Sequence, residues 1–476
     1  MKLFNYYLLN VIAQGLGRVF TFGSNFIVFA LTARFFGSEF FGQYSYILNY
    51  FGIMVIFADF GLMSVLGKDI AQQKDAPQLY WGNFLMLRLF INILVMFFSI
   101  LIAYYIRRDL FLLLLMGSFA IPFLASRFFE PVFQVFRRPW YSAYASIIYG
   151  LAHLIFAFVA IKSNGKLINF VLAYVTANIL YAFIAFYLSK KSVKPLFKID
   201  RIIIKNILKL SMPLGISSIF IIISNRISIL MLAWLKSDYA VGIYSAAYKF
   251  VEISSFLAAM ATAPLIPIFA EKANHGPEAV KYMSSNIFEV VAIVLLPFGI
   301  LCSLISKEII ILIYGIKLLP SAEVFNILIW VCIIIFYSLL ISSVVISLGI
   351  VRYAYWLGPL SAFLSTILNY ILISRFSYTG AAWTALICEV VLAGVTIIYA
   401  IKNTGNFLRF KTWMIILILN CLLYVFLVQG IFVFNLYLKM IIGLVLYFLC
   451  VFKLRILKKD VYDLLNIKAY FLKTFR

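Results

Sequence analysis

Long apolar runs separated by short polar segments dominate the pattern of this chain. A helix needs about 20 mostly apolar residues to cross a bilayer, and runs of this length recur from the first residues to the last. Their lengths predict about fourteen spans: 10–33, 41–66, 81–106, 110–136, 140–161, 167–188, 207–235, 241–270, 283–305, 319–347, 353–374, 380–401, 412–431 and 435–454. The pattern therefore predicts an all-α polytopic membrane protein.

Composition supports this class and excludes others. Only 12% of the residues are charged, whereas soluble domains carry roughly 25%. The five cysteines lie inside apolar runs without metal-ligand spacing, and there are two histidines and no HExxH or CxxC motif. These features exclude a disulfide scaffold and disfavour a metal or thiol enzyme, so we expect no metal and no cofactor.

The net charge of +23 reflects orientation in the membrane. Cytoplasmic loops collect Lys and Arg, and a cytoplasmic N-terminus places about 24 of these residues inside and about 9 outside. The stretch 189–206 alone contributes six of them. We expect an inner-membrane protein with both termini in the cytoplasm, and no nucleic-acid partner.

An internal repeat appears when the sequence is shifted by 200 residues. Nine of the 31 positions from 15 to 45 are identical to their counterparts, and most are Gly, Ser, Asn or Tyr. Six predicted spans separate the copies, which indicates a parallel repeat about an axis along the membrane normal, with a solute site between the halves. We expect these segments: a first six-helix bundle (1–188), a basic linker (189–206), a second six-helix bundle (207–402), two further transmembrane helices (403–456) and a basic tail (457–476).

Several stretches resemble one family of membrane proteins. "FGSEFFGQYSYILNYFGIMVIFADFGL" (36–62) is similar to the N-terminal signature of polysaccharide-lipid (O-antigen, Wzx-type) flippases, a branch of the multidrug/oligosaccharidyl-lipid/polysaccharide (MOP) exporter superfamily. The stretches "SDYAVGIYSAAYKFVEI" (237–253), "APLIPIFAE" (263–271), "IYGIKLLPSAEVFNIL" (313–328) and "YTGAAWTALICE" (378–389) fit the same pattern. The order and spacing of these loose motifs carry the resemblance.

The resemblance implies a V-shaped fold of two six-helix bundles followed by two additional helices. It also implies a substrate, an undecaprenyl-diphosphate-linked oligosaccharide that moves from the cytoplasmic to the outer leaflet. Membrane lipids and polysaccharide-assembly proteins are the implied partners, and we expect a monomer. The lipid II flippase is a cousin, and the multidrug exporters form a further branch.

Cations inside the predicted spans are the candidate substrate-binding residues. A diphosphate-linked sugar requires a hydrated, cationic cavity, and charge inside a span is costly unless it faces such a cavity or a partner. Arg18 and Arg226 lie in the first span of each half, and Arg18 is too deep to reach the interface by snorkelling. Arg88 is two turns from the cytoplasmic end, so both a cavity position and snorkelling remain open for it.

Two further cations come with an acid three residues later. Arg127 precedes Glu130 and Lys249 precedes Glu252, and residues at this spacing share a helix face. Each pair is therefore either a self-neutralising structural pair or part of the substrate cavity. The resemblance favours the cavity for Lys249, because the lipid II flippase carries a cavity arginine at this place.

The remaining buried acids have two interpretations each. Glu389 lies near the middle of its span without a nearby cation in sequence. It is either a coupling group for H⁺ or Na⁺, or a protonated glutamate packed between helices. Asp59 lies near the cytoplasmic end of its span, where we expect it to cap a helix or form a pair at an inner gate.

Three functions remain in competition at this stage. The first is a flippase that works by alternating access, with H⁺ or Na⁺ coupling as an open option. The second is a multidrug cation exporter, whose cavity should be acidic. The third is a membrane-embedded glycosyltransferase or polysaccharide polymerase, which should have a large reactive loop that this chain lacks. We expect no enzymatic activity, and the absence of a GxxxxGK[ST] motif argues against direct use of ATP.

Overall fold

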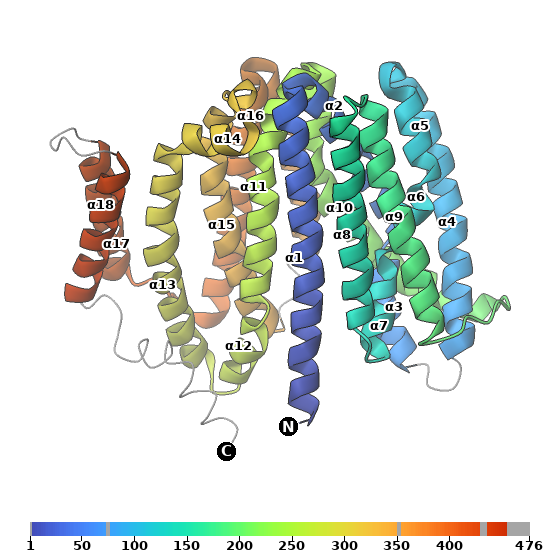
Figure 1. The fold of residues 1–476 in the computed structure, drawn as a ribbon. Helices are drawn as coiled ribbons and strands as arrows, with labels where there is room; N and C mark the ends of the chain where they lie inside the picture. The colour runs from blue at the N-terminus through green and yellow to red at the C-terminus, as the bar shows by residue number, and fades with distance from the viewer. Residues whose placement is uncertain (1, 73–76, 350–353, 429–435, 455–476) are drawn as a thin grey trace. The chain divides into compact units, whose positions relative to one another are not determined.

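A computed structural model describes residues 2–72, 77–349, 354–428 and 436–454, which fold into helices without a strand (Figure 1). The predicted tail, 457–476, lies outside this part. In chain order the helices are α1 (Lys2–Phe36), α2 (Ser38–Asp59), α3 (Leu62–Gln72), α4 (Pro77–Ile106), η1 (Arg108–Leu110), α5 (Phe111–Phe119), α6 (Ile121–Leu124), η2 (Ser126–Phe128), α7 (Phe129–Val135), α8 (Trp140–Lys162), α9 (Leu167–Lys190), α10 (Arg201–Leu235), α11 (Asp238–Thr262), α12 (Leu265–Ala273), α13 (Pro277–Leu304), α14 (Ser306–Tyr314), η3 (Ile316–Leu318), α15 (Ser321–Ser347), α16 (Ala354–Thr404), α17 (Phe410–Val428) and α18 (Leu436–Lys453).

The number of spans agrees with the prediction once α16 is divided. In the described residues, 11 helices are long and apolar enough to cross a membrane, or up to 13 if each of two bent pairs is one span. Helix α16 has 51 residues and would be about 76 Å long, more than twice the hydrocarbon thickness of about 30 Å. It is broken at Ser377, where φ is 53°. The predicted spans 353–374 and 380–401 are therefore its two parts, and the fold class of about fourteen spans is confirmed.

Three spans that the sequence predicts as continuous are broken. The span 41–66 is divided into α2 and α3, with Phe60 in the left-handed region at φ 44° between them. The span 110–136 consists of short helices bent by 58° between Arg108–Phe119 and Ile121–Val135, and Pro122 lies at the start of α6. The span 241–270 is divided into α11 and α12, bent by 42°, with Pro264 at the break. Proline lacks an amide hydrogen and clashes with the preceding turn, so it interrupts a helix. The apolar pattern contains no such break.

The repeat predicted from the sequence is present in the helices. Both α1 and α10 have 35 residues, and α2 and α11 begin at Ser38 and Asp238, 200 residues apart. Helices α4 and α13 begin at Pro77 and Pro277. The parallel repeat is thus confirmed, and its register extends beyond the sequence identities.

Two glycines pack the copies against each other at equivalent positions. A Cβ atom on Gly42 of α2 would lie 1.8 Å from the Asp238 carbonyl oxygen. A Cβ atom on Gly242 of α11 would lie 2.0 Å from the Ser38 carbonyl oxygen. A shift of 200 residues converts the contact between Gly42 and Asp238 into the contact between Gly242 and Ser38. This equivalence is expected for elements related by a two-fold axis.

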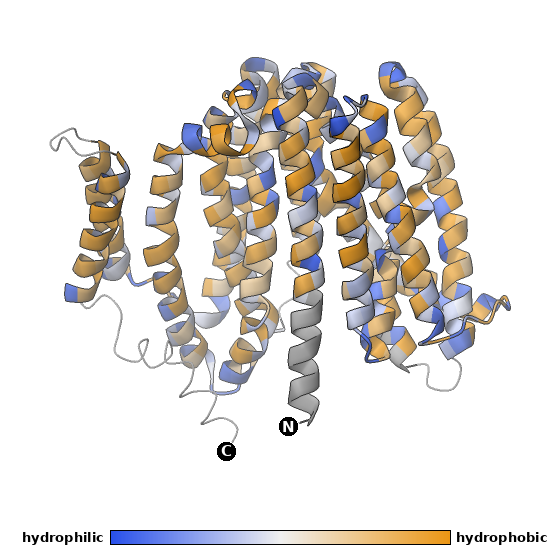
Figure 2. Ribbon diagram, in the orientation of Figure 1, coloured by the Kyte–Doolittle hydropathy of each residue, from blue (hydrophilic) through white to orange (hydrophobic). Residues whose placement is uncertain are grey.

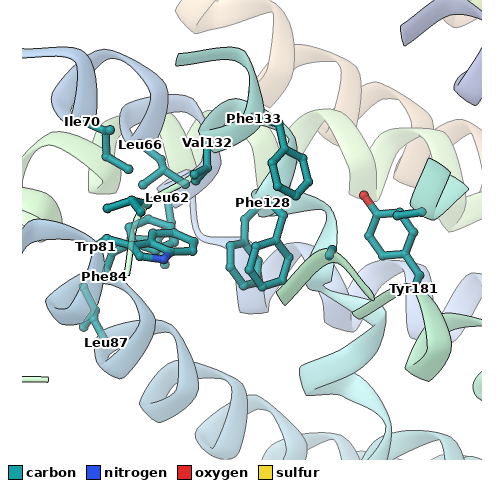
Figure 3. Packing of buried hydrophobic residues seen from close by; sticks show 14 of the residues in the cluster. Leu62, Leu66, Ile70, Trp81, Phe84, Leu87, Phe128, Val132, Phe133 and Tyr181 are labelled. Atoms are coloured by element: carbon teal, nitrogen blue, oxygen red, sulfur yellow. The ribbon is translucent and has the colours of Figure 1, made fainter. Parts of the chain in front are cut away.

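Compact packing divides the chain into two units. The first comprises Met1–Lys249, Ile311–Ser321 and Tyr355–Thr384, and the second comprises Phe250–Ile310, Ala322–Ala354 and Ala385–Arg476. In the first unit, α8 lies between α1 and α9 (Figure 1). Its aromatic core gathers Trp81 and Phe84 of α4 with Phe128, Val132 and Phe133 (Figure 3). In the second unit, α13 packs against α17 and α18.

The linker between α9 and α10 runs along the start of α4. The Leu196 amide donates to the Gln78 carbonyl at 3.0 Å. The Asn83 side chain donates to the Lys198 carbonyl at 2.8 Å and accepts from the Asp200 amide at 2.8 Å. Asp200 also caps α10 by accepting from the Ile202 amide at 2.9 Å. These bonds hold the basic segment beside the α4 N-terminus.

Hydrophobic residues predominate along the helices, as the colours in Figure 2 show, and many of their large apolar side chains are exposed. On α4, for example, Phe90 is 61% exposed and Phe97 is 57% exposed. Large exposed apolar areas are rare on soluble monomers. The chain is therefore a multi-pass membrane protein.

Candidate functional site

Arg18, Arg127 and Glu130 form one cluster in the first unit. Arg18 of α1 reaches Glu130 of α7, with 3.6 Å between Nη2 and Oε2. Arg127 of η2 binds the other oxygen, with 3.2 Å between Nη1 and Oε1. The predicted Arg127–Glu130 pair is therefore confirmed, but two arginines share its carboxylate. Half of the Arg18 side chain remains exposed, so the cluster has an accessible positive side.

Tyrosines extend this cluster into the helix bundle. The Arg127 guanidinium lies over the Tyr181 ring at 4.8 Å and the Tyr149 ring at 5.7 Å, both distances from Cζ to the ring centroid. Rings hold a guanidinium through the negative face of their π system. The Tyr149 hydroxyl donates to Asn25 Oδ1 at 2.8 Å, which connects α8 to α1.

His153 continues the polar connection across α8. Its Nδ1 lies 3.0 Å from Asn25 Oδ1, and its Nε2 lies 3.5 Å from the Tyr44 hydroxyl. Its ring also contacts that of Tyr174 with 5.8 Å between centroids. Sequence reasoning missed Asn25 and His153 as site residues. The available signal was the presence of an ionisable side chain inside a span, which marks a functional position by default.

Arg226 joins the same region from α10. Its Nη1 donates to Asn49 Oδ1 of α2 at 2.5 Å. A Cβ atom on Gly52 would lie 2.8 Å from Arg226 Cζ, so the guanidinium rests on bare backbone. Tyr174 interacts electrostatically with both Arg226 and Arg127. These contacts define the arginine–tyrosine network: Arg18, Asn25, Asn49, Arg127, Glu130, Tyr149, His153, Tyr174, Tyr181 and Arg226.

Lys249 of α11 approaches the N-terminal helix. Its Nζ lies 4.0 Å from the centroid of the Phe29 ring on α1. Its predicted neighbour Glu252 is half-buried, and both residues have further interactions. The role of the Lys249 and Glu252 pair in the cavity therefore stays a prediction.

Arg88 lies in a different place from the network. It is 3% exposed, and its Nη1 donates to Asp59 Oδ1 at 2.8 Å while its Nη2 donates to the Ala125 carbonyl at 2.7 Å. The Phe128 ring lies 4.3 Å from its Cζ. The snorkelling interpretation of Arg88 is therefore wrong, and Asp59 forms the pair expected of it. A substrate contact of Arg88 remains a prediction.

Glu389 lies in the second unit, where the Ser338 hydroxyl donates to its Oε1 at 2.7 Å. It is half-buried, and a hydroxyl donor can serve both its charged and its neutral form. Among the described residues, no group of three or more His, Cys, Asp or Glu side chains could hold a metal ion.

At the opposite end of α4, a guanidinium connects the two copies of the repeat. Arg107 Nη1 and Nη2 each donate to one oxygen of Asp238, both at 3.0 Å, and its Nε donates to Asp109 at 2.9 Å. The Tyr46 ring lies 4.8 Å from Arg107 Cζ. A two-pronged guanidinium–carboxylate contact is geometrically specific, so it fixes the N-terminus of α11 against the loop after α4.

Comparisons with known proteins agree with this architecture. The sequence profile described as "Polysaccharide biosynthesis protein" matches residues 7–273, which is more than half of the chain. No curated protein sequence matches the chain significantly.

Solved structures are similar in fold. A structure of the lipid II flippase MurJ in an inward closed conformation has a TM-score of 0.76 and 15% identity, over 93% of this chain and 97% of that one. An inward-facing MATE-family multidrug resistance transporter of the MOP superfamily has a TM-score of 0.66 and 14% identity, over 82% and 97%. An outward-facing structure of such a transporter has a TM-score of 0.56 and 14% identity, over 83% and 94%. The chain therefore belongs to the polysaccharide biosynthesis protein family and has the fold of MOP-superfamily flippases and transporters.

Proposed function

We propose that this protein flips an undecaprenyl-diphosphate-linked oligosaccharide, the repeat unit of a polysaccharide, from the cytoplasmic to the outer leaflet of the inner membrane. The observation that carries the proposal is the charge balance of the arginine–tyrosine network. Arg18 and Arg127 share the carboxylate of Glu130, and Arg226 is held by the neutral Asn49. The network therefore has an excess of positive charge at membrane depth, which suits a diphosphate.

The other groups of the network suit the remaining parts of such a substrate. Guanidinium groups bind phosphate oxygens through paired donors. Tyrosine hydroxyls, amides and ring faces offer hydrogen bonds and stacking surfaces to sugars. The lipid tail can stay in the bilayer, so it requires no polar contacts. A multidrug cation exporter would instead require an excess of acids at this place.

Movement between leaflets requires access from each side in turn. With the N-terminus in the cytoplasm, the Arg107–Asp238 contact lies at the exterior ends of the helices. There the reciprocal Gly42 and Gly242 contacts also bring α2 and α11 together. These interactions close the exterior side of the first unit. Opening that side breaks a small number of specific contacts and leaves the helix cores unchanged.

Glu389 and Ser338 are the candidate coupling pair. A carboxyl group in a largely apolar surrounding exchanges protons at a cost set by its environment. Substitution Glu389→Gln fixes the neutral state. We expect this variant to flip substrate without responding to an imposed proton or Na⁺ gradient, whereas a merely packed glutamate would leave the gradient response unchanged.

The central test is flipping of an undecaprenyl-diphosphate-linked oligosaccharide in proteoliposomes. Substitutions Arg18→Ala, Arg226→Ala and Lys249→Ala should each lower the rate by about 10- to 100-fold, because a hydrogen bond to a charged group contributes about 1.5–3 kcal/mol. The control is Lys162→Ala, at the exposed last residue of α8, which should leave the rate unchanged. Undiminished flipping in all three variants would reject the cationic site.

The same liposomes separate the competing functions. Transport of organic cations without oligosaccharide flipping would identify a multidrug exporter. Transfer of sugar from an activated donor would identify a glycosyltransferase or polymerase, so the proposal expects translocation and no bond formation. We expect a monomer to flip the substrate without a second copy, so liposomes that contain one copy each should retain the flipping activity.

A further inference from the structure

A pocket on the lateral face of the first unit is lined by residues outside the arginine–tyrosine network. It has a volume of about 380 Å³ and lies among α4, α6, α7, α9 and the linker. This volume falls within the range of about 300–1,000 Å³ typical of ligand sites. Apolar side chains dominate its walls, including Leu89, Phe123, Phe183, Phe186 and Phe197. Leu89 and Phe183 are more than half exposed, so the pocket opens to the surface that faces lipid.

Three buried polar residues, Arg88, Asn92 and Ser126, also line this pocket. Arg88 and Asn92 are each 3% exposed. In the part of the chain that the structure describes, Arg88 Nε and Asn92 Oδ1 have no hydrogen-bond partner. Buried polar atoms without partners are unfavourable. A ligand that enters the pocket with a carbonyl acceptor at this depth would satisfy the Arg88 Nε–H group.

The linker at the mouth of the pocket combines basic and apolar side chains. Lys194, Lys198 and Arg201 are exposed, and so are Phe197 and Ile199, at 60% and 70%. Figure 2 shows both hydrophilic and hydrophobic colours along this segment. Such composition is typical of segments at the membrane surface, where basic residues attract anionic lipids. Phe197 belongs to both the linker and the pocket.

The distance along α4 between the linker and Arg88 matches the dimensions of a lipid headgroup. Asn83 binds the linker at Lys198, and Arg88 follows five residues later, about 7.5 Å further along α4. The headgroup region on each side of a bilayer is about 5–8 Å deep. The basic linker and Arg88 are thus separated by about the distance between a lipid phosphate and its ester groups.

We propose that the pocket and the linker together form a binding site for an anionic phospholipid of the cytoplasmic leaflet. One acyl chain fills the pocket against the phenylalanines, the glycerol ester region meets Arg88 and Asn92, and the phosphate lies at Lys194 and Lys198. An anionic phospholipid fits this site because the apolar pocket is continuous with a rim that is both basic and apolar. The site does not depend on the proposed transport function.

Native mass spectrometry of the full chain in detergent tests the headgroup contact. The probes are phosphatidylglycerol and phosphatidylcholine with identical acyl chains. We expect the wild type to prefer phosphatidylglycerol, and Lys194→Gln with Lys198→Gln to weaken that preference by about fivefold for each lysine. The matched control is Lys162→Gln with Lys166→Gln. These two lysines lie where α8 ends and α9 begins, at the end of α9 opposite to the linker, and their substitution should retain the preference. Equal binding of both lipids to the wild type would overturn the headgroup assignment.

A bulky substitution at the pocket mouth tests the acyl-chain contact. Leu89→Trp should lower the binding of both lipids. Ile93→Trp should not, because Ile93 is also exposed on α4, at 48% against 55% for Leu89, but lies outside the pocket. Size-exclusion profiles verify the fold, and Phe183→Trp replaces Leu89→Trp if that variant is misfolded. Unchanged lipid binding in the folded pocket variants would overturn the assignment of the pocket.

Discussion

The hairpin formed by α1 and α2 and the hairpin formed by α10 and α11 are two copies of one element, and they differ in their charges. Helices α1 and α10 both have 35 residues, α2 and α11 begin 200 residues apart, and Gly42 and Gly242 make reciprocal backbone contacts. However, Arg18 corresponds to Ser218, and Arg226 corresponds to Phe26. This comparison indicates that both copies kept the close backbone contact at their glycines, whereas each copy acquired its cations at different positions.

The two copies of the repeat also differ in charge at an ion pair between α2 and α4. The buried pair Arg88–Asp59 of the first copy corresponds to Phe288 and Ala259 in the second, which are both apolar. Buried ion pairs and well-packed apolar residues can be of similar stability, whereas a single unpaired charge is strongly destabilising. The two copies therefore represent two solutions for the same position.

The largest expected effect comes from the glycines that join the copies. Substitution Gly42→Ala places a methyl group 1.8 Å from a backbone oxygen, and Gly242→Ala places one 2.0 Å from its counterpart. Since backbone cannot move as a side chain can, each should destabilise by at least about 3 kcal/mol, and together they should abolish folded protein. Thermal unfolding in detergent measures this. The control is Gly23→Ala in α1, with open space around its Cβ atom; equal stability of Gly42→Ala and Gly23→Ala would contradict the packing argument.

The ion pair between Arg88 and Asp59 should give the next largest effect. Substitution Arg88→Ala leaves the partly exposed Asp59 without its guanidinium and should cost about 1.5–3 kcal/mol in unfolding free energy. Introducing the residues of the second copy, Arg88→Phe with Asp59→Ala, should recover most of this loss. A double variant that is less stable than Arg88→Ala would show that the pair does more than neutralise charge.

Exchanging the charge between copies should affect transport more than stability. In Arg226→Phe with Phe26→Arg, the cation moves to the equivalent position of the other copy. We expect flipping to fall at least about tenfold, because Asn49 and Gly52 no longer hold the guanidinium, which amounts to about 1.4 kcal/mol. Arg226→Lys should be intermediate, since it keeps the charge and loses the planar fork. Wild-type flipping rates in the exchanged variant would show that only net charge matters.

The smallest effect is expected at the exterior contact. Asp238→Ser introduces the residue of the first copy, Ser38, and removes one of the two carboxylates that bind Arg107. Such a partly exposed pair contributes about 1 kcal/mol or less. Hydrogen exchange in segments 106–110 and 236–242 should rise by up to about fivefold. Lys281→Gln, which removes an exposed pair with Glu278, serves as the control and should leave these segments unchanged.

The sequence by itself determined the membrane class, the approximate number of spans and the repeat. These properties are local or periodic: the length of an apolar run decides whether it can span, and identities at a fixed shift report duplication. The pair Arg127–Glu130 also followed from the sequence, because residues three apart share one helix face.

Only the tertiary structure decided which charges meet. Arg18 binds Glu130, Arg88 binds Asp59 and Arg226 binds Asn49, and each contact joins different helices. The lateral pocket and the network around His153 likewise depend on the helix faces that come together. Spacing along the chain fixes neighbours on one helix, whereas contacts between helices depend on packing, which no local pattern contains.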